Sequence, residues 1–228
     1  MRMRRKKHLE ERLAACGDII IFMDRENRDF GFKDTEHMLD MRELFGDEKP
    51  VIMEIGCGKG QFICELAKRD PQYNYIAVEK ASNVVVDAAE RAIAEGLTNV
   101  RFLRGGAEYL DCYVPEHTAE LIYLNFSCPF PKKSYAGHRL THRKFLAMYE
   151  RLLKVGGEIH QKTDNMHFFE FSIGEFSQSG WGLKNVSLDL HASGFEGNIV
   201  TEYEQRFSEQ GMPIYRLEAY RLGTEGGV

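Results

Sequence analysis

Long hydrophobic runs are missing from the sequence. No stretch of about 18 apolar residues occurs, so no segment has the length of a membrane-spanning helix. The first residues, MRMRRKKHLEERL, also lack the apolar core of a secretory signal. The 228 residues, with 43 % hydrophobic and 29 % charged side chains, fit one large globular domain. We therefore expect a cytoplasmic protein that does not associate with a membrane.

The sequence lacks the paired cysteines that are typical of disulfide bridges and zinc sites. There are five cysteines, an odd number, and no two of them are arranged as C-x-x-C. They are Cys16, Cys57, Cys64, Cys112 and Cys128. This pattern disfavours disulfide bridges and zinc sites, and the spacing of His160 and His167 suits no pair of ligands on one helix face. We expect free thiols and no bound metal, with the histidines, His191 included, in ordinary polar or packing roles.

A net positive charge is also missing. The formal net charge is −5, which by itself argues against a nucleic-acid partner. Basic residues nevertheless cluster in two stretches. The first comprises Arg2, Arg4, Arg5, Lys6 and Lys7, and the second comprises Lys132, Lys133, Arg139, Arg143 and Lys144. Each stretch is open to two interpretations, a phosphate-binding surface and a solvated surface.

An alternation of strands and helices begins at Pro50. We interpret residues 1–48, which are polar apart from an apolar run at Ile19 to Met23, as a basic N-terminal arm and lead-in. Strands are predicted at 51–55, 75–78, 100–103, 121–126, 158–162, 183–188 and 215–220, and helices at 61–69, 82–95, 141–153 and 167–179. Ser82 is placed to cap a helix that Gly96 ends, and Thr201-x-x-Glu204 matches a capping box.

Repeated strand–helix–strand units predict an α/β fold with a doubly wound, mostly parallel sheet and helices on both faces. The last two strands have little helix between them, which predicts an antiparallel pair at the C-terminal edge. This domain would span residues 49–228.

The segment VIMEIGCGKG, residues 51–60, joins the first buried strand to three glycines. In a doubly wound sheet, ligands bind beyond the carboxyl ends of the strands, and glycines let a ligand approach the backbone closely. The spacing of Gly56, Gly58 and Gly60 is G-x-G-x-G. It differs from the dinucleotide pattern G-x-G-x-x-G and from a phosphate loop, which ends in G-K-S/T.

Two carboxylates accompany this turn. Glu79 closes the second strand, 19 residues after Gly60, where it could accept hydrogen bonds from both ribose hydroxyls of an adenosine. Glu54 lies within the apolar first strand, and a buried charge needs a partner. A sulfonium or amino group of a cofactor would provide one. The turn, Glu54 and Glu79 together predict an S-adenosylmethionine-dependent methyltransferase.

Several longer segments resemble the bacterial tRNA (guanine-N7)-methyltransferase family, from the basic N-terminus to the end of the chain. They are MEIGCGKGQF, AVEK, YLNFSCPFPKK, HQKTDN and DLHASGFEGNIVTEYEQRF. The resemblance implies a Rossmann-like class I methyltransferase fold, S-adenosylmethionine as the cofactor and tRNA as the partner. The methylated atom would be N7 of a guanine in the variable loop. Whether the chain is a monomer or a homodimer stays open.

The resemblance also implies roles for individual residues. Those implied to bind the cofactor are Glu54, Gly56, Gly58, Gly60, Glu79, Gly106, Ala107 and Cys128. Cys128 and Asp164 occupy the positions implied at the catalytic centre. The residues implied to contact the substrate are Lys132, Asp164, Thr201, Glu202, Tyr203 and Glu204. The loop implied to touch RNA comprises Ser134, Tyr135, Ala136, Gly137, His138 and Arg139.

The chain departs from the family pattern at three places. The family usually has Asp-Pro-Trp where this chain has Cys128-Pro129-Phe130, it commonly has Asp at the position of Gly106, and its RNA loop is more basic. Guanine N7 carries a lone pair and no proton, so methyl transfer needs positioning and no general base. We therefore expect an active methyltransferase that is slower or differently tuned. The alternatives are a methyltransferase with another acceptor and a catalytically weak or inactive RNA-binding relative.

Overall fold

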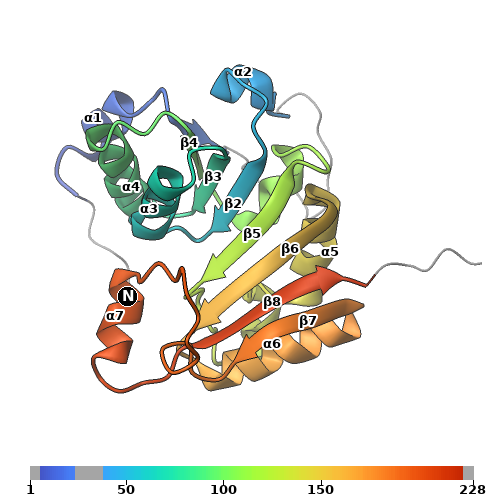
Figure 1. The fold of residues 1–228 in the computed structure, drawn as a ribbon. Helices are drawn as coiled ribbons and strands as arrows, with labels where there is room; N and C mark the ends of the chain where they lie inside the picture. The colour runs from blue at the N-terminus through green and yellow to red at the C-terminus, as the bar shows by residue number, and fades with distance from the viewer. Residues whose placement is uncertain (1–5, 24–37, 223–228) are drawn as a thin grey trace, which may run out of the picture. The chain divides into compact units, whose positions relative to one another are not determined.

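The computed structural model of the chain describes residues 6–23 and 38–222, apart from the side chain of Glu202. These residues fall into two compact units, divided between Thr118 and Ala119 (Figure 1). Arg2, Arg4 and Arg5 of the expected basic arm lie outside the described residues. None of the described helices has the length and apolarity that crossing a bilayer requires.

Four parallel strands form the centre of the described part of the first unit. They are β1 (Ile20–Phe22), β2 (Val51–Ile55), β3 (Asn74–Glu79) and β4 (Val100–Arg104). Their order in the sheet is β1-β4-β3-β2. All five residues of β2 are buried, as its unbroken apolar run predicts. β1 falls within the apolar run of the expected lead-in and pairs with β4, while the domain boundary after residue 48 stays a prediction.

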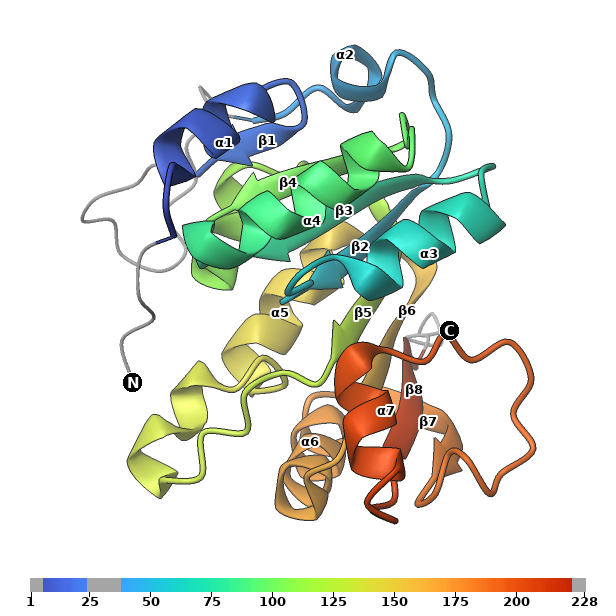
Figure 2. The same cartoon turned by 90° about the vertical axis from the view of Figure 1, so that its left-hand side faces the viewer.

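The described helices of this unit alternate with its strands from Pro50 onward, as expected. They are α1 (Leu9–Ala15), α2 (Met41–Phe45), α3 (Gln61–Arg69), α4 (Ser82–Ala94) and the 3-10 helix η2 (Ala107–Cys112). Both α3 and α4 pack on one face of the strands (Figure 2). The predicted apolar face of α3, with Phe62, Ile63 and Leu66, is buried against them.

The predicted cap of α4 is wrong. The helix begins at Ser82 itself, its N-cap residue is Ala81, and no side chain caps it. The Ser82 hydroxyl instead accepts a hydrogen bond from Arg104 Nε at 2.8 Å. The local pattern predicted that the Ser82 hydroxyl would accept from the helix backbone, but it accepts from Arg104, which is distant in sequence. Gly96, with a φ of 67°, lies just past the end of the helix, as predicted.

Ion pairs connect α4 with α1 and with Lys6, which precedes α1. Arg12 contacts Glu90 at 2.6 Å and Asp87 at 2.9 Å. Lys6 Nζ lies 2.5 Å from the same Asp87 carboxylate. Lys6 belongs to the basic stretch that was open to two interpretations, a phosphate-binding surface and a solvated surface, and its charge is paired within the unit.

The described part of the second unit also contains four strands. They are β5 (Ala119–Asn125), β6 (Leu153–Thr163), β7 (Trp181–Ser187) and β8 (Tyr215–Arg221). Their order is β5-β6-β8-β7, with β5 parallel to β6 and β8 antiparallel to both β6 and β7. The expected α/β class, with mostly parallel strands and an antiparallel C-terminal pair, is confirmed.

The described helices of the second unit are η3 (Lys133–His138), α5 (Arg143–Leu152), α6 (Met166–Gln178) and α7 (Glu202–Ser208). Both α5 and α6 pack on β6, and α6 also contacts β7 and β8. A buried hydrogen bond of 2.8 Å between Thr141 Oγ1 and Ser172 Oγ joins the approach to α5 with α6. Arg143 adds an ion pair of 2.8 Å with Glu175. These contacts fix the end of the loop that leads from β5 into α5.

Gly60 allows α3 to approach α4 closely. Its φ is 75°, and a Cβ at this position would lie 2.7 Å from Ala88 Cβ. Gly46, at the end of α2, has a φ of 78° and would place its Cβ with nothing within 4 Å. The two glycines therefore share a left-handed backbone and differ in the space around them.

We predict that Gly60→Ala destabilises the protein more than Gly46→Ala. In both variants the free energy of unfolding should fall by about 1–2 kcal/mol, because a left-handed backbone is unfavourable for alanine. Gly60→Ala loses about 1–3 kcal/mol more because its Cβ overlaps Ala88. Urea unfolding of the two variants measures this difference. Equal losses would show that Ala88 makes no close contact with this position.

Candidate functional site

The glycine turn after β2 is attached to the end of β3. The backbone N–H groups of Gly56 and Cys57 both donate to the carbonyl of Val78, at 2.8 and 3.0 Å. Gly56 and Gly58 have φ values of 87° and 57°, which favour glycine. A Cβ at either position would meet nothing within 4 Å, so the backbone is open on this side. The turn therefore offers a surface that a ligand could approach closely.

The Glu79 carboxylate lies against this turn. Its Oε2 accepts a hydrogen bond from Gly58 N at 3.2 Å, and its Oε1 accepts one from Ala81 N at 2.8 Å. Burial raises the pKa of Glu79 above its ordinary value, and these backbone donors oppose the rise. Each carboxylate oxygen has further lone pairs, so the group can still accept hydrogen bonds from a pair of hydroxyls.

Negative charge is concentrated around the turn. Glu54 on β2 is only 2 % exposed. Burial raises the pKa of the Cys57 thiol well above its ordinary value, and the charges of Glu54 and then Glu79 raise it further. A neutral thiol beside two carboxylates leaves an environment that favours a positively charged group. The turn and its carboxylates fit a cationic nucleoside ligand such as S-adenosylmethionine.

The end of β4 adds a third segment beside Glu79. Gly105 N donates to the carbonyl of Glu79 at 3.1 Å, and Gly106 then leads into η2 at Ala107. A Cβ at Gly106 would lie 2.5 Å from Cδ of Glu108. The Glu108 carboxylate therefore occupies the space that a side chain at position 106 would take.

In the second unit, the parallel register of β5 and β6 brings two predicted catalytic residues to one edge. Asn125 pairs with Lys162, so the chain leaves both strands at the same edge. From there it continues to Cys128 after β5 and to Asp164 after β6. Asp164 is half-buried, and no residue within the described ranges pairs with its carboxylate. Cys128 is exposed, whereas the other four cysteines are buried.

The loop after β5 has a strained backbone that Arg139 holds. Phe126 and Phe130 have φ values of 51° and 40°, a region that bulky side chains rarely adopt. Arg139 donates to the carbonyls of Pro129 and Phe130, at 2.9 and 3.0 Å. Its guanidinium also lies 4.3 Å from the centre of the Phe171 ring. Arg139, expected to touch RNA, is thus engaged within the protein.

The remaining side chains of the expected RNA loop differ in their surroundings. Lys132 and Ser134 are exposed, and Tyr135 is exposed at the surface of η3. The His138 ring lies near both Phe130 and Tyr135, at centroid distances of 5.7 and 5.9 Å. Ala136 and Gly137, which lie between Tyr135 and His138 in the sequence, are half-buried. The exposed members are therefore available for contact with a partner.

The segment before α7 confirms only half of the predicted capping box. Thr201 Oγ1 accepts a hydrogen bond from Glu204 N at 3.0 Å. The Glu204 side chain does not return to the cap and is fully buried, with Oε2 at 2.7 Å from Lys162 Nζ. Tyr203 is 60 % exposed, and the side chain of Glu202 lies outside the described residues. The sequence pattern HQKTDN contained Lys162, but nothing in it identified Glu204 as its partner.

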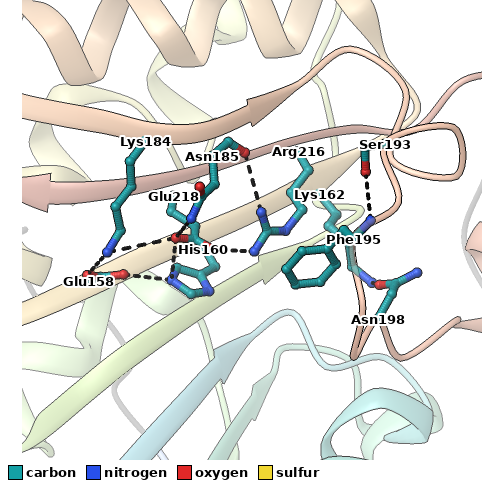
Figure 3. Close-up of polar contacts among 10 residues, drawn as sticks. All are labelled: Glu158, His160, Lys162, Lys184, Asn185, Ser193, Phe195, Asn198, Arg216 and Glu218. Atoms are coloured by element: carbon teal, nitrogen blue, oxygen red, sulfur yellow. Dashed lines mark hydrogen bonds and ion pairs between the residues drawn. The ribbon is translucent and has the colours of Figure 1, made fainter.

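A second polar cluster lies on β6 and β8 (Figure 3). Among the described residues, Glu158, His160 and Glu218 place their ligand atoms within 4.8 Å of one another, close enough to hold a metal ion. Lys184 forms an ion pair with Glu158, and Arg216 forms one with Glu218. Because these cations already neutralise the carboxylates, we assign the cluster to polar packing of the sheet. The expected absence of a metal stays a prediction.

We predict that Arg139→Ala changes the reactivity of Cys128 in the absence of any RNA. Loss of the two hydrogen bonds frees the strained loop that carries the thiol, so its alkylation by iodoacetamide should change at least about threefold. Lys133→Ala is the control, because Lys133 is exposed in the same loop. Mass spectrometry of the modified peptides gives the rates. Identical rates in both variants and the wild type would show that Arg139 does not hold the loop.

Comparison with known proteins adds close relatives. The family described as "Putative methyltransferase" matches residues 48–217. A curated tRNA (guanine-N(7)-)-methyltransferase of Geobacillus sp. (strain WCH70) is 47 % identical over 218 residues, which cover 96 % of this chain and 94 % of the relative. A protein of the same name from Geobacillus kaustophilus (strain HTA426) is 44 % identical over 221 residues, covering 97 % of each.

Solved structures share the fold. An antibiotic-related methyltransferase has a TM-score of 0.57 and 20 % identity, covering 79 % of this chain and 90 % of that chain. The 16S rRNA methyltransferase KamB has a TM-score of 0.59 and 15 % identity, covering 80 % of this chain and 92 % of that chain. At these identities the likeness concerns the fold alone.

Proposed function

Because the chain belongs to the tRNA (guanine-N7)-methyltransferase family, we propose that it transfers a methyl group from S-adenosylmethionine to N7 of a guanine in the variable loop of tRNA. The observation that supports this most is the similarity to two proteins of that name along nearly the whole chain. The open glycine turn beside Glu79 supports it independently, because its geometry suits an adenosine.

S-adenosylmethionine, when bound, supplies an electrophilic methyl group on a positively charged sulfur. The open backbone at Gly56 and Gly58 would lie against the cofactor, and Glu79 would hold its ribose hydroxyls. Glu54 would favour its cationic part. Gly106 and Ala107, which follow β4, would border the adenine. These assignments use only groups that surround the turn in the first unit.

On the acceptor side, the protein has to orient the base. Guanine N7 attacks with its own lone pair, so the side chains bind and hold and need not remove a proton from it. Asp164 would accept hydrogen bonds from guanine N1 and N2 and favour the positive charge that develops on the ring. Cys128 would border the reacting groups as a weak acceptor. Lys132 and Ser134 would meet phosphates from the exposed loop.

Incubation with methyl-labelled S-adenosylmethionine and unmodified tRNA tests the proposal. We expect N7-methylguanine in the digested tRNA. We also expect Asp164→Asn to lower kcat/KM about ten- to a hundredfold, because a charge-assisted hydrogen bond to guanine is weakened. Asp189→Asn is the control, since Asp189 is exposed and accepts from Ala192 N, as asparagine also can.

Three outcomes would contradict the proposal in different ways. Bound cofactor without N7-methylguanine would exclude the proposed reaction. Label transferred to another RNA or to a small molecule would identify a methyltransferase with another acceptor. Binding of RNA without binding of the cofactor would identify a non-catalytic relative.

The raised pKa of Glu79 predicts a pH-dependent affinity for the cofactor. Because burial raises this pKa, Glu79 takes up a proton at a higher pH than an ordinary glutamate as the pH falls. The protonated group is a poorer acceptor for ribose hydroxyls, so the affinity for S-adenosylmethionine should fall as the solution becomes acidic. Calorimetric titration across the acidic range measures this. Glu79→Gln should bind more weakly and without this dependence, while Glu43→Gln, an exposed control on α2, should behave like the wild type.

A further inference from the structure

Lys162 is a buried cation that donates hydrogen bonds to three acceptors from one distant segment. Its Nζ donates to Asn198 Oδ1 at 3.0 Å, to the carbonyl of Ile199 at 3.0 Å and to Glu204 Oε2 at 2.7 Å. The residue is only 6 % exposed and lies on β6 (Figure 3). A buried ammonium group is tolerated only when it is paired in this way. Lys162 therefore fastens the segment before α7 to the sheet.

The Glu204 carboxylate is the centre of the same arrangement. It is fully buried, and its Oε1 accepts from Asn198 Nδ2 at 2.5 Å and lies 3.1 Å from His191 Nε2. Its backbone N–H donates to Thr201 Oγ1. The chain from His191 to Glu204 thus folds around one carboxylate. In this arrangement the Glu204 carboxylate is not available to a substrate.

The backbone of Lys162 holds a different part of the acceptor side. Its carbonyl accepts a hydrogen bond from Phe126 N at 2.8 Å, at the start of the strained loop that carries Cys128. Two residues further along the chain is Asp164. One residue on β6 thereby connects three segments. They are the loop after β5, Asp164 and the segment before α7, each of which carries a residue that the resemblance implies at the catalytic centre or against the substrate.

We propose that Lys162 is a positioning residue for methyl transfer, and that Glu204 acts through its ion pair with Lys162 without touching the guanine. This inference rests on the proposed function. The pair holds Thr201 and the exposed Tyr203 in place at the start of α7, and Lys162 fixes the position of these groups relative to Asp164. Binding of the cofactor, which belongs to the first unit, does not depend on the pair.

A double-mutant cycle on the full-length protein tests the pair. The variants are Lys162→Met, Glu204→Gln and the two combined, with kcat and KM measured for tRNA and for S-adenosylmethionine. Each single variant should lower kcat about a hundredfold, because the remaining buried partner loses its counter-charge. The KM for S-adenosylmethionine should stay within about twofold, and the double variant should be no slower than either single variant. Lys154→Met, an exposed lysine on the same strand, is the control.

Two results would overturn the inference. One is a Lys162→Met variant with normal kcat beside an inactive Glu204→Gln variant, since that would place Glu204 directly on the base. The other is a double variant in which the fold-decrease in kcat equals the product of the fold-decreases in the two single variants. If the variants of the buried pair do not fold, Asn198→Ala replaces them in the test. It removes the hydrogen bonds of Asn198 to Lys162 and Glu204 and leaves both charges of the pair in place. It should lower kcat about five- to tenfold, and an unchanged kcat would contradict the proposal.

Hydrogen exchange separates this inference from the proposed function, because it needs neither tRNA nor activity. Lys162→Met or Asn198→Ala should speed amide exchange in residues 198–204, which the Lys162 side chain and Asn198 contact. Residues 126–130 should exchange as in the wild type, because the backbone carbonyl that accepts from Phe126 N is kept. Unchanged exchange in residues 198–204 would refute the coupling even if the wild type methylates tRNA. A wild type that binds the cofactor and methylates no tRNA would instead refute the proposed function.

Discussion

Parallel strand pairing is the constraint on which the candidate sites depend. In each unit it brings the carboxyl ends of neighbouring strands to one edge, where loops from different parts of the chain meet. The pairing of β2 with β3 sets the glycine turn against Val78 and Glu79. The pairing of β5 with β6 sets the loop after Asn125 against Lys162. Polar groups that stand alone in the sequence thereby become neighbours, and these groups carry the proposed chemistry.

The two units perform different physical tasks. Around the glycine turn, open backbone and two carboxylates create an environment for a positively charged nucleoside ligand. In the second unit, ion pairs and hydrogen bonds hold strained or irregular segments, as Arg139 does for the loop at Phe130. This division fits a reaction in which the acceptor atom brings its own lone pair. Such an enzyme gains most from holding its substrates in line, so a cysteine at position 128, where the resemblance implies an aspartate, is compatible with activity.

Local patterns in the sequence predicted most of the fold and part of the sites. Apolar runs, glycine turns and helical spacing are short-range signals, and they placed β2, α3 and the open turn correctly. Side-chain partners distant in sequence leave no such signal. The hydroxyl of Ser82 was predicted to cap a helix and instead accepts from Arg104. Glu204 was assigned to the substrate by resemblance, while its burial against Lys162 depends on the packing of a segment 42 residues away.

A crystal structure of the protein with S-adenosylhomocysteine tests most directly whether the glycine turn and Glu79 bind the cofactor. We expect the adenosine to lie against the backbone of Gly56 and Gly58, with both ribose hydroxyls within hydrogen-bond distance of the Glu79 carboxylate. An adenosine bound elsewhere, with Glu79 keeping only its backbone contacts to Gly58 and Ala81, would contradict this expectation.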